Sequence, residues 1–260
     1  MSHEKSILWH IEISHYNEKA RWALDLKGVD HERRAPTPGA HMLVALWLTG
    51  GRHKTFPVLQ LDGEAIGDST AIIAALERGF PDPPLYPEDP DERSRALDLE
   101  EFFDEELGPH VRLLAFHEAT KDPAIVERFT VDVLPRRLAD VAPVRAGAAR
   151  FFSAFTGLRY GVKSDRRAEL ARGKILAGFD RLESELGDRE YLVGDRFTVA
   201  DLTAASLLYP LVQPPEGPWL PPPPAALERF REPLEDRPGF RWVEEMFRRH
   251  RQRAVAPLAA

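Results

Sequence analysis

The 260-residue sequence contains no cysteine. This absence excludes disulfide bonds, zinc sites built on cysteine and every mechanism with a cysteine nucleophile, and it fits a reducing compartment. Long apolar runs are also missing. The longest nearly apolar stretch, Leu202 to Val212, is interrupted by Pro210 and is well short of the ~20 residues that cross a bilayer. The first ten residues lack the apolar core of a secretory signal. We therefore expect a cytoplasmic protein that does not enter membranes.

An excess of positive charge is missing as well. Lys and Arg number 35 against 42 Asp and Glu, which gives a formal net charge of −7. Proteins that bind nucleic acids usually carry a basic excess, so we expect no nucleic-acid partner. What the chain does contain is 43% hydrophobic and 30% charged residues. These proportions are typical of a folded protein with a sizeable core.

The composition divides the chain near residue 80. Before that point short apolar runs alternate with helical patterns, and Asp62-Gly63 is a strong signal for a two-residue hairpin turn. The expected order is strand, helix, strand, helix, strand, strand and helix, over residues 6–13, 16–27, 29–34, 41–48, 57–61, 64–66 and 69–78. The pattern predicts an α/β domain of βαβαββα order in residues 1–80.

Proline marks the end of this domain. Five prolines among residues 80–90 exclude a helix or a central strand, so we interpret residues 81–90 as a linker. Beyond the linker the periodicity is helical, which predicts an all-α domain over residues 91–260. Its expected helices cover 91–119, 124–155 with breaks near Pro135 and Pro143, 164–186, 199–212 and 240–251. The segment 199–212 is apolar nearly all round and should be the buried central helix. The proline-rich residues 214–224 are interpreted as a long surface loop.

Thr198 and Asp201 predict how the central helix begins. Thr198 can cap the helix, and Asp201, three residues on, can accept a hydrogen bond from the Thr198 amide as Glu or Gln does in a capping box. Phe197 and Leu202 flank the pair in the positions of a hydrophobic staple. A role in folding explains this motif without any role in function.

The segment Thr55-Phe-Pro-Val-Leu59 places a proline at the start of a strand. Because proline has no N–H for a sheet ladder, a cis peptide at Phe56-Pro57 would turn the neighbouring backbone outward. The backbone of Val58 could then pair with a bound peptide, as an added strand does. An ordinary trans proline that opens a strand is the alternative.

The segment Gly67-Asp-Ser-Thr-Ala71 lies between a predicted strand and a predicted helix. The first amides of a helix lack partners and attract a carboxylate. Ser69 can add a hydroxyl donor and Asp68 can hold an ammonium group, a pair that suits an α-amino acid head group. One alternative is a simple helix cap. Another is the nucleophile elbow of a hydrolase, which needs further βα units that the helical second half does not offer.

The segment Ser14-His-Tyr-Asn-Glu-Lys-Ala-Arg21 lies where the first strand meets the first helix. A hydroxyl beside a helix N-terminus can donate to an anion and stabilise it. Ser14 is the best placed donor, and Tyr16 and Asn17 are candidate helpers. The alternative is that Ser14 or Asn17 only caps the helix.

In their common order, these segments resemble the cytosolic glutathione transferases of the serine type found in bacteria. Ser14 to Gly28 is similar to the family's first helix, Thr55 to Leu59 to its cis-proline segment, and Gly67 to Ile73 to its γ-glutamyl-binding turn. Phe197 to Leu202 is similar to the capping box of its helical domain. The resemblance covers almost the whole chain and is weakest over residues 124–161.

The resemblance implies a thioredoxin-like N-terminal domain, an all-helical C-terminal domain, a homodimer, glutathione as co-substrate and no metal. Ser14 stands in the place of the thiol-activating Ser or Cys, and His15 replaces the proline that follows it in many relatives. Asn17 stands where several subgroups carry Cys or Ser, so Ser14 and Asn17 both remain candidates for thiol activation. The absence of cysteine excludes the branch that reduces mixed disulfides. The residues implied in glutathione binding are Lys54, Phe56, Pro57, Val58, Asp68 and Ser69, with His53 and His41 as further donors to the glycine carboxylate.

The implied activity is transfer of the glutathione thiolate to a small hydrophobic electrophile. An apolar pocket for the electrophile is expected from Phe103, His110 and Tyr160, with Phe102 and Phe116 as further candidates and Trp219 as a lid. Residues 141–162 are expected to cover the pocket. His110, His117 and Glu118 have poor spacing for a metal site, so solvated or packed histidines are expected instead. The alternative function is a non-catalytic binding or assembly module on the same fold.

Overall fold

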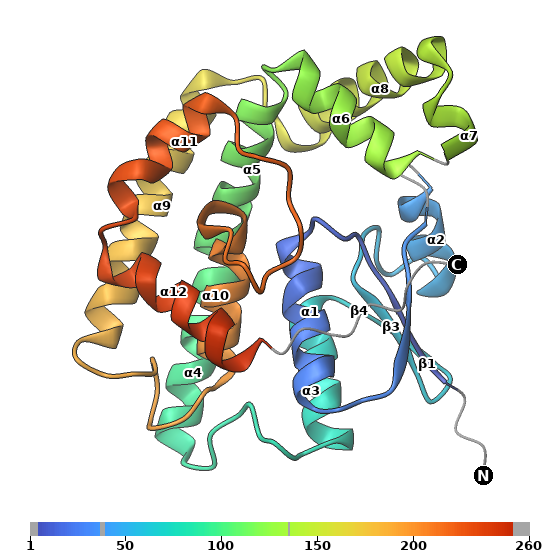
Figure 1. Ribbon diagram of the computed structural model, residues 1–260. Coiled ribbons are helices and arrows are strands. Elements are labelled where there is room, and N and C mark those ends of the chain that lie inside the picture. The colour runs from blue at the N-terminus through green and yellow to red at the C-terminus, as the bar shows by residue number, and fades with distance from the viewer. Residues whose placement is uncertain (1–4, 37–39, 135, 252–260) are drawn as a thin grey trace.

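The computed structural model describes residues 5–36, 40–134 and 136–251 (Figure 1). The N-terminal domain is built on a four-stranded mixed sheet of order β2-β1-β3-β4. Strand β1 (Ser6–Trp9) is parallel to β2 (His31–Arg34) and antiparallel to β3 (Val58–Leu61), and β3 is antiparallel to β4 (Glu64–Gly67). The predicted βαβαββα order is confirmed.

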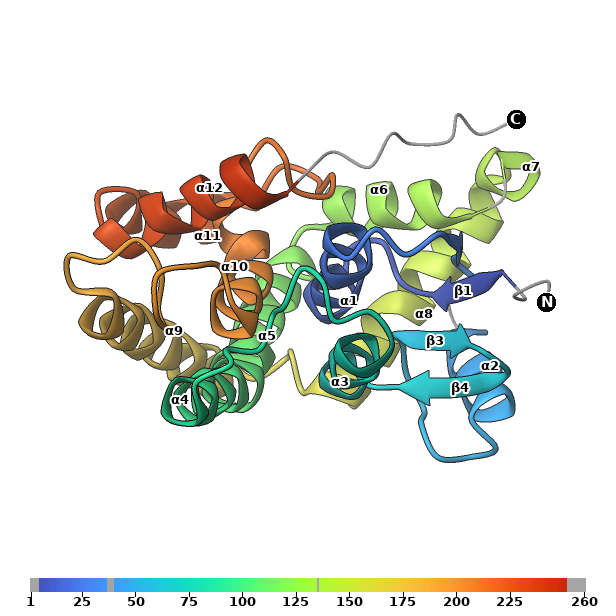
Figure 2. The ribbon, with the colours of Figure 1, turned by 90° about the horizontal axis from the view of Figure 1, so that it is seen from below.

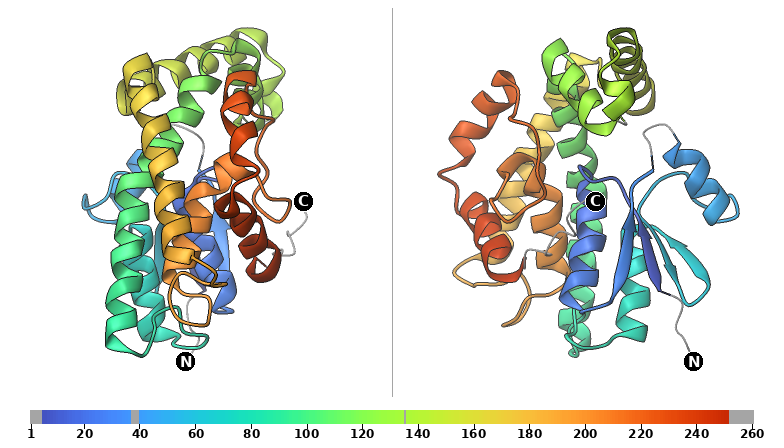
Figure 3. Two further views of the ribbon diagram at one scale, coloured as in Figure 1. Left: turned by 90° about the vertical axis from the view of Figure 1, so that its left-hand side faces the viewer. Right: turned by 45° about the vertical axis from the view of Figure 1, so that its right-hand side comes forward.

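Three helices cover the two faces of this sheet. Helices α1 (His15–Leu26) and α3 (Ser69–Gly79) lie on the face toward the helical domain, and α2 (His41–Leu48) lies on the other face (Figure 3). Strand β1 is shorter than expected because the chain turns away from the sheet after Trp9. In this turn the amide of Ser14 donates a hydrogen bond to the carbonyl of Ile11. The predicted hairpin turn is present, with positive φ at both Asp62 and Gly63.

No helix or strand occupies the described residues 80–89, but this connection is tied to the N-terminal domain. The Glu77 carboxylate accepts hydrogen bonds from the amides of Leu85 and Tyr86. The Lys27 ammonium group donates to the carbonyls of Phe80 and Pro83. These bonds hold the start of the second domain in a defined position against α1 and α3.

The second domain is helical throughout, as predicted. Its helices are α4 (Pro90–Phe102), α5 (Gly108–Ala119), α6 (Pro123–Val133), α7 (Arg136–Ala139), α8 (Ala142–Tyr160), α9 (Asp165–Leu186), α10 (Val199–Val212), α11 (Ala225–Arg231) and α12 (Pro238–His250). The predicted helix over 91–119 contains a π-helical turn at Phe103–Leu107 that separates α4 from α5. Helix α11 was not predicted, because its seven residues are too few to show a helical period. The predicted break at Pro135 lies outside the described residues.

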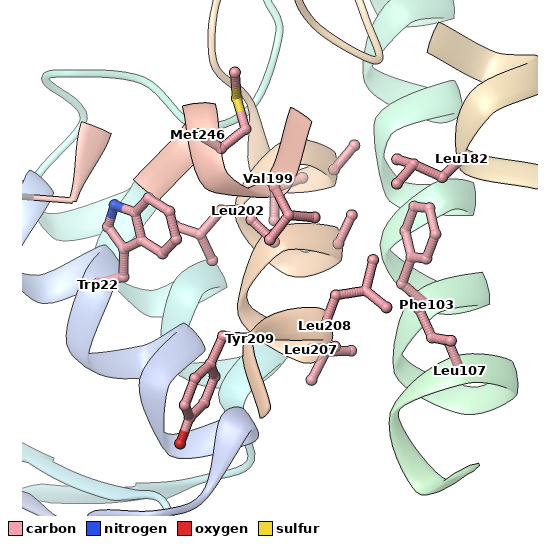
Figure 4. Packing of buried hydrophobic residues seen from close by; sticks show 14 of the residues in the cluster. Trp22, Phe103, Leu107, Leu182, Val199, Leu202, Leu207, Leu208, Tyr209 and Met246 are labelled. Carbon is pink, nitrogen blue, oxygen red and sulfur yellow. The ribbon is translucent and has the colours of Figure 1, made fainter. Parts of the chain in front are cut away.

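Helix α10 is the core of the second domain. All of its residues are buried, and Figure 2 shows it among α1, α5 and α12. Trp22 points from α1 toward Leu202 of α10, and Phe103 and Leu107 line another side of the same helix (Figure 4). The capping box is present: the Thr198 amide and hydroxyl both donate to Asp201 Oδ2. The two domains therefore share one hydrophobic core around α10.

Helices α6, α7 and α8 extend from the top of α5 toward the N-terminal domain (Figures 1 and 3). On α8, Phe155 meets the ring of His41 on α2, with ring centroids 6.1 Å apart. On the inner side, Phe116 of α5 packs against Phe152 and Tyr160 of α8. Most of residues 141–162, which the sequence predicts as a cover of the pocket, thus form the regular helix α8. No helix among the described residues combines the length and apolar character that crossing a bilayer requires.

Candidate active site

A cavity of about 400 Å³ lies between the two domains. The N-terminal domain lines it with residues from all three of the segments singled out in the sequence: Ser14, His15, Tyr16, Thr55, Phe56, Pro57, Asp68 and Ser69. The helical domain contributes residues from α5, α6, the end of α8 and the proline-rich connection after α10. Folding thus brings the first segment beside the other two, although Tyr16 and Thr55 are 39 positions apart in the sequence.

Ser14 is the N-cap of α1, and its side chain belongs to a hydrogen-bonded pair with Asn17. Ser14 Oγ accepts from the amide N–H of Asn17 at 3.4 Å and from Asn17 Nδ2 at 2.7 Å. Because a serine hydroxyl has one hydrogen to donate, two accepted bonds leave that hydrogen for a partner in the cavity. Capping and donation into the cavity are therefore compatible roles for Ser14.

Asn17 itself is fully buried and does not line the cavity. Its Nδ2 also donates to the Phe56 carbonyl at 3.3 Å, and its Oδ1 accepts from the Ile11 amide at 3.0 Å. Both hydrogens of the side-chain amide are therefore engaged within the protein. The alternative in which Asn17 itself donates to a bound thiolate conflicts with this geometry, and Asn17 instead positions Ser14.

Tyr16 forms part of the cavity wall with its ring. Its hydroxyl donates to the backbone carbonyl of Asp104 at 2.6 Å, so the hydrogen is already used. Burial raises the pKa of the Tyr16 phenol well above its usual range, which keeps the group neutral. Beside it, burial and then Arg112 lower the pKa of His15 well below its usual value, so this ring is neutral too. Of the two hydroxyl groups in this segment, that of Ser14 is the one whose hydrogen remains for the cavity.

The Phe56–Pro57 peptide is cis, and it lines the cavity. The Pro57 carbonyl accepts from the Asp68 amide at 3.3 Å, a bond that joins the second and third segments. Val58 differs from expectation. It is fully buried between β1 and β4, opposite Trp9 on one side and Gly67 on the other, so no open sheet edge lies beside it. Among the described residues no hydrogen-bond partner takes the N–H of Phe56, a residue that lines the cavity.

Asp68 and Ser69 form the turn before α3. Asp68 has φ +78° and ψ 135°, a conformation that residues with a side chain rarely adopt. Its Oδ1 accepts from the amides of Thr70 and Ala71 at 2.9 and 3.1 Å, so Asp68 does cap the helix. The amide and the hydroxyl of Ser69, which is buried at the cavity wall, remain for a ligand. The strained conformation of Asp68 thus exposes one face of this turn to the cavity.

His53 lines the cavity, whereas the neighbouring Lys54 does not. Lys54 is exposed and does not line it, which corrects the expectation for that residue, and the half-buried His41 does not line it either. The ring of His53 packs directly on Gly67, where a Cβ atom would come within 2.5 Å of the ring. A glycine at position 67 therefore allows His53 to approach the strand and face the cavity.

The expected electrophile pocket is only partly correct. Tyr160 and Phe116 line the cavity. Phe103 is fully buried against α10, and His110 does not line the cavity because it lies two residues, or about 200° of helix rotation, before Arg112, which does. Phe102 is absent from the lining too, and Trp219 is 60% exposed outside it.

Sequence reasoning missed two parts of the wall. One is Arg112, whose only sequence signal was its place on the same predicted helix as His110. The other is the proline-rich segment, which was interpreted as a surface loop although Leu220 to Pro224 line the cavity. In the part of the chain that the structure describes, no three His, Asp or Glu side chains gather in a way that could hold a metal ion.

The fold and the cavity define a class: a thioredoxin-like domain followed by an all-helical domain, with a cleft between them. Residues 8–84 match the family described as "Glutathione S-transferase, N-terminal domain", and residues 142–244 match "Glutathione S-transferase, C-terminal domain". The chain therefore belongs to the glutathione S-transferase superfamily.

Individual relatives carry two kinds of name. A probable maleylacetoacetate isomerase of Caenorhabditis elegans is 33% identical over 96 residues, a match that spans 37% of this chain and 45% of that protein. A maleylacetoacetate isomerase of Dictyostelium discoideum is 23% identical and covers 80% of both chains. A glutathione S-transferase of Methylobacterium radiotolerans, solved in complex with glutathione sulfonate, is 27% identical with a TM-score of 0.57, over 92% of this chain and 93% of that one.

Proposed function

We propose that this protein is a glutathione transferase that joins the thiolate of glutathione to a small hydrophobic electrophile, with Ser14 as the catalytic residue. The observation that carries the proposal is the Ser14–Asn17 pair, which leaves the Ser14 hydroxyl hydrogen for an anion in the cavity. Membership of the superfamily supports glutathione as the source of that anion. The rest of the cavity agrees with this assignment.

Glutathione would lie along the N-terminal wall. Ser69 and Asp68 would hold its γ-glutamyl end, because a hydroxyl and a carboxylate match an α-carboxylate and an α-ammonium group. The free N–H of Phe56 would donate to a carbonyl of the cysteinyl residue, in the role first expected of Val58. His53 would take the glycine end, in the role first expected of Lys54. This order brings the sulfur toward Ser14.

The chemistry needs little beyond the thiolate and its position. A free thiol has a pKa near ~8.5, so only a few per cent is ionised at neutral pH. A hydrogen bond from Ser14 at the N-terminus of α1 stabilises the thiolate and raises its population. The walls that face the electrophile are largely apolar, which excludes water and holds the two reactants together.

The relatives' names point to a second reaction at the same thiolate. Several are isomerases, and a glutathione-dependent isomerase regenerates the thiol, whereas a transferase consumes it. Measuring free thiol before and after complete turnover of an electrophile separates the two. A stoichiometric loss of thiol supports transfer.

Replacing Ser14 tests the proposal directly. A hydrogen bond to an anion is worth about 1.5–3 kcal/mol, so Ser14→Ala should lower conjugation of glutathione to chlorodinitrobenzene by about 10- to 100-fold. Ser164→Ala is the matched control, because Ser164 also caps a helix through its side chain but lies at α9, outside the cavity lining. Equal turnover in Ser14→Ala and wild type would show that a donor other than Ser14 stabilises the thiolate.

Retention on immobilised glutathione separates catalysis from the alternative of a non-catalytic module. Retention followed by turnover supports the transferase, and retention without turnover supports the module. Absence of retention would contradict glutathione as the ligand and point to another thiol.

We also propose that the protein acts as a cytoplasmic homodimer, on the strength of the family resemblance. Light scattering should then give twice the chain mass of 29.4 kDa. The mass of a single chain would contradict the proposed homodimer but would leave the proposed chemistry unaffected.

A further inference from the structure

Arg112 is held in the cavity by aromatic rings. Its guanidinium carbon lies 5.6 Å from the ring centroid of Tyr16 and 4.7 Å from that of Tyr160. Both rings and Arg112 line the same cavity. One helical turn before Arg112, a Cβ atom at Gly108 would lie 2.5 Å from the Tyr16 hydroxyl, so α5 and the start of α1 are in close contact. Arg112 is therefore held over a ring only two residues along the chain from Ser14.

No counter-ion of Arg112 is found within residues 5–36, 40–134 and 136–251. Among the residues that the structure describes, no carboxylate lies within 4 Å of Arg112, and its buried Nε has no hydrogen-bond partner. Arg237, with comparable aromatic contact, has two carboxylate partners, Asp180 and Glu183. A partly buried charge without a partner is costly, although cation–π contacts offset a part of that cost. The cation is therefore arranged for an anion that the protein itself does not supply.

Among the groups that line the cavity, Arg112 is the one best suited to bind an anion. It is the one Lys or Arg among the described residues that line the cavity. Residues 221–224 are four consecutive prolines, which have no N–H to donate. The acidic groups of the lining are Asp68, at the far end of the proposed glutathione site, and Glu105, which is exposed and forms no ion pair with Arg112. An anionic group on the second substrate would therefore accept hydrogen bonds from the guanidinium group of Arg112.

We propose that Arg112 binds a carboxylate of the electrophile, so that the substrates of this enzyme are apolar or aromatic carboxylates. The inference deepens the proposed transferase function and rests on it for the reaction, but carboxylate binding itself needs no glutathione. The planar guanidinium would face the carboxylate with two N–H groups, while the apolar walls contact the body of the substrate. The carboxylate would fix which carbon faces the sulfur near Ser14.

A matched pair of ligands tests the binding. 3,5-Dinitrobenzoate and its methyl ester differ in charge but share the ring. Calorimetry without glutathione should show the acid binding the wild-type protein about 10- to 100-fold more tightly than the ester, the ratio expected of a charged hydrogen-bonded pair. Arg112→Gln should abolish this preference, and Arg112→Lys should retain a part of it.

The control variant is Arg159→Gln. Arg159 lies over the same Tyr160 ring, with its guanidinium carbon 5.3 Å from the ring centroid, but it does not line the cavity. Its replacement should leave the preference for the acid unchanged. Equal affinity of the wild-type protein for acid and ester would overturn the proposal without any variant, and so would a preference that survives in Arg112→Gln.

Turnover distinguishes this inference from the proposed function. With 4-chloro-3,5-dinitrobenzoate, the glutathione sulfur forms a bond to the ring carbon, chloride leaves with the electron pair of the broken C–Cl bond, and the thiol proton passes to solvent. The wild-type kcat/KM should exceed that for the methyl ester by about 10-fold or more, and Arg112→Gln should remove the difference. Equal turnover of acid and ester would reject the carboxylate site and keep the transferase. Selective binding of the acid without turnover would keep the site and reject the transferase.

Discussion

Asn17 is a buried residue that orients the half-buried Ser14 at the cavity. Its side-chain amide donates to Ser14 and to the Phe56 carbonyl and accepts from the Ile11 amide. All its hydrogen-bonding groups are therefore used in fixing the direction of the Ser14 hydroxyl and the loop before Pro57. An aspartate at this position would have nearly the same shape but could only accept.

The substitution Asn17→Asp reverses this arrangement. The Ser14 hydroxyl should donate to the new carboxylate, and the bound thiolate should lose its donor. We expect turnover to fall about as far as in Ser14→Ala, with the pH at half-maximal turnover about 1–2 units higher, since one pKa unit corresponds to about 1.4 kcal/mol. The double variant Ser14→Ala/Asn17→Asp should be no slower than either single variant, because both act on one hydrogen bond. Additive losses would contradict a positioning role for Asn17.

His10 is a second residue with a defined protonation state. Burial, and then the nearby Arg21, Arg33 and His31, lower the pKa of His10 from 6.5 to about 3. Arg21 Nη1 donates to His10 Nδ1 at 2.9 Å, a bond that only the neutral imidazole accepts. The unfolded chain therefore binds a proton below pH 6.5 that the folded protein does not bind until about pH 3.

Stability should consequently fall as the pH drops below 6.5, because protons favour the unfolded chain in the window from 6.5 to about 3. His10→Asn keeps an acceptor for Arg21 but does not titrate. Between pH 7 and pH 5 the wild-type protein should lose about 2 kcal/mol more unfolding free energy than the variant, at about 1.4 kcal/mol per unit below 6.5. Urea unfolding at both pH values measures the difference. If the unfolding free energies of the two proteins changed equally between pH 7 and pH 5, this account would be contradicted.

At the scale of elements, the N-terminus of α10 differs from that of an exposed helix. Asp201 accepts from the Leu192 amide, the Thr198 amide and the Thr198 hydroxyl, all between 2.8 and 2.9 Å. Burial raises the pKa of Asp201 to about 6, and these hydrogen bonds oppose the rise, so the group is still ionised at pH 7. At α4, by contrast, Asp89 is exposed and accepts only from the amides of Asp91 and Glu92.

The two caps should therefore differ in their contribution to stability. Asp89→Ala should cost about 1 kcal/mol, the usual value for an exposed cap. Asp201→Ala should cost about 3 kcal/mol or more, because it also leaves buried donors without partners. Denaturant unfolding at pH 7 compares the two variants. Equal losses would show that burial of the capping box adds nothing.

At the scale of the whole molecule, a buried ion cluster joins the two domains. Lys19 of α1 is fully buried, and its Nζ lies 2.7 Å from Glu100 and 2.5 Å from Asp104 of the helical domain. The same ammonium group donates to the Thr70 hydroxyl on α3 at 2.9 Å. Burial raises the pKa of Glu100, and the proximity of Lys19 opposes this rise. One ammonium group thus forms ion pairs with two carboxylates at the boundary between the domains.

Removing that side chain should destabilise the protein strongly. Lys19→Met leaves two buried carboxylates without their cation, and we expect a loss of about 3–5 kcal/mol. Lys174→Met is the control, because Lys174 pairs with Glu106 where both side chains are about half exposed, and such a pair contributes about 0–1 kcal/mol. Similar losses in both variants, measured by denaturant unfolding, would contradict the role of the buried cluster.

The features that depend on neighbours along the chain could be predicted from the amino-acid sequence alone. The order βαβαββα, the hairpin at Asp62-Gly63 and the capping box at Thr198 follow from turn residues, caps and hydrophobic periods within a few residues of each other. The same local signals identified the three segments that line one wall of the cavity, because each lies at a junction between elements.

The side chains that come together across the cleft could not be predicted in this way, because they depend on how the two domains pack. The tertiary structure placed Val58 inside the sheet, His53 rather than Lys54 at the cavity, Phe103 in the core, and Arg112 between Tyr16 and Tyr160. The two contacts of Arg112 join residues 96 and 48 positions apart, and the contact with Tyr16 depends on how α5 is rotated against α1. The packing of the whole core around α10 sets that rotation, so the rotation cannot be predicted from any short segment of the sequence.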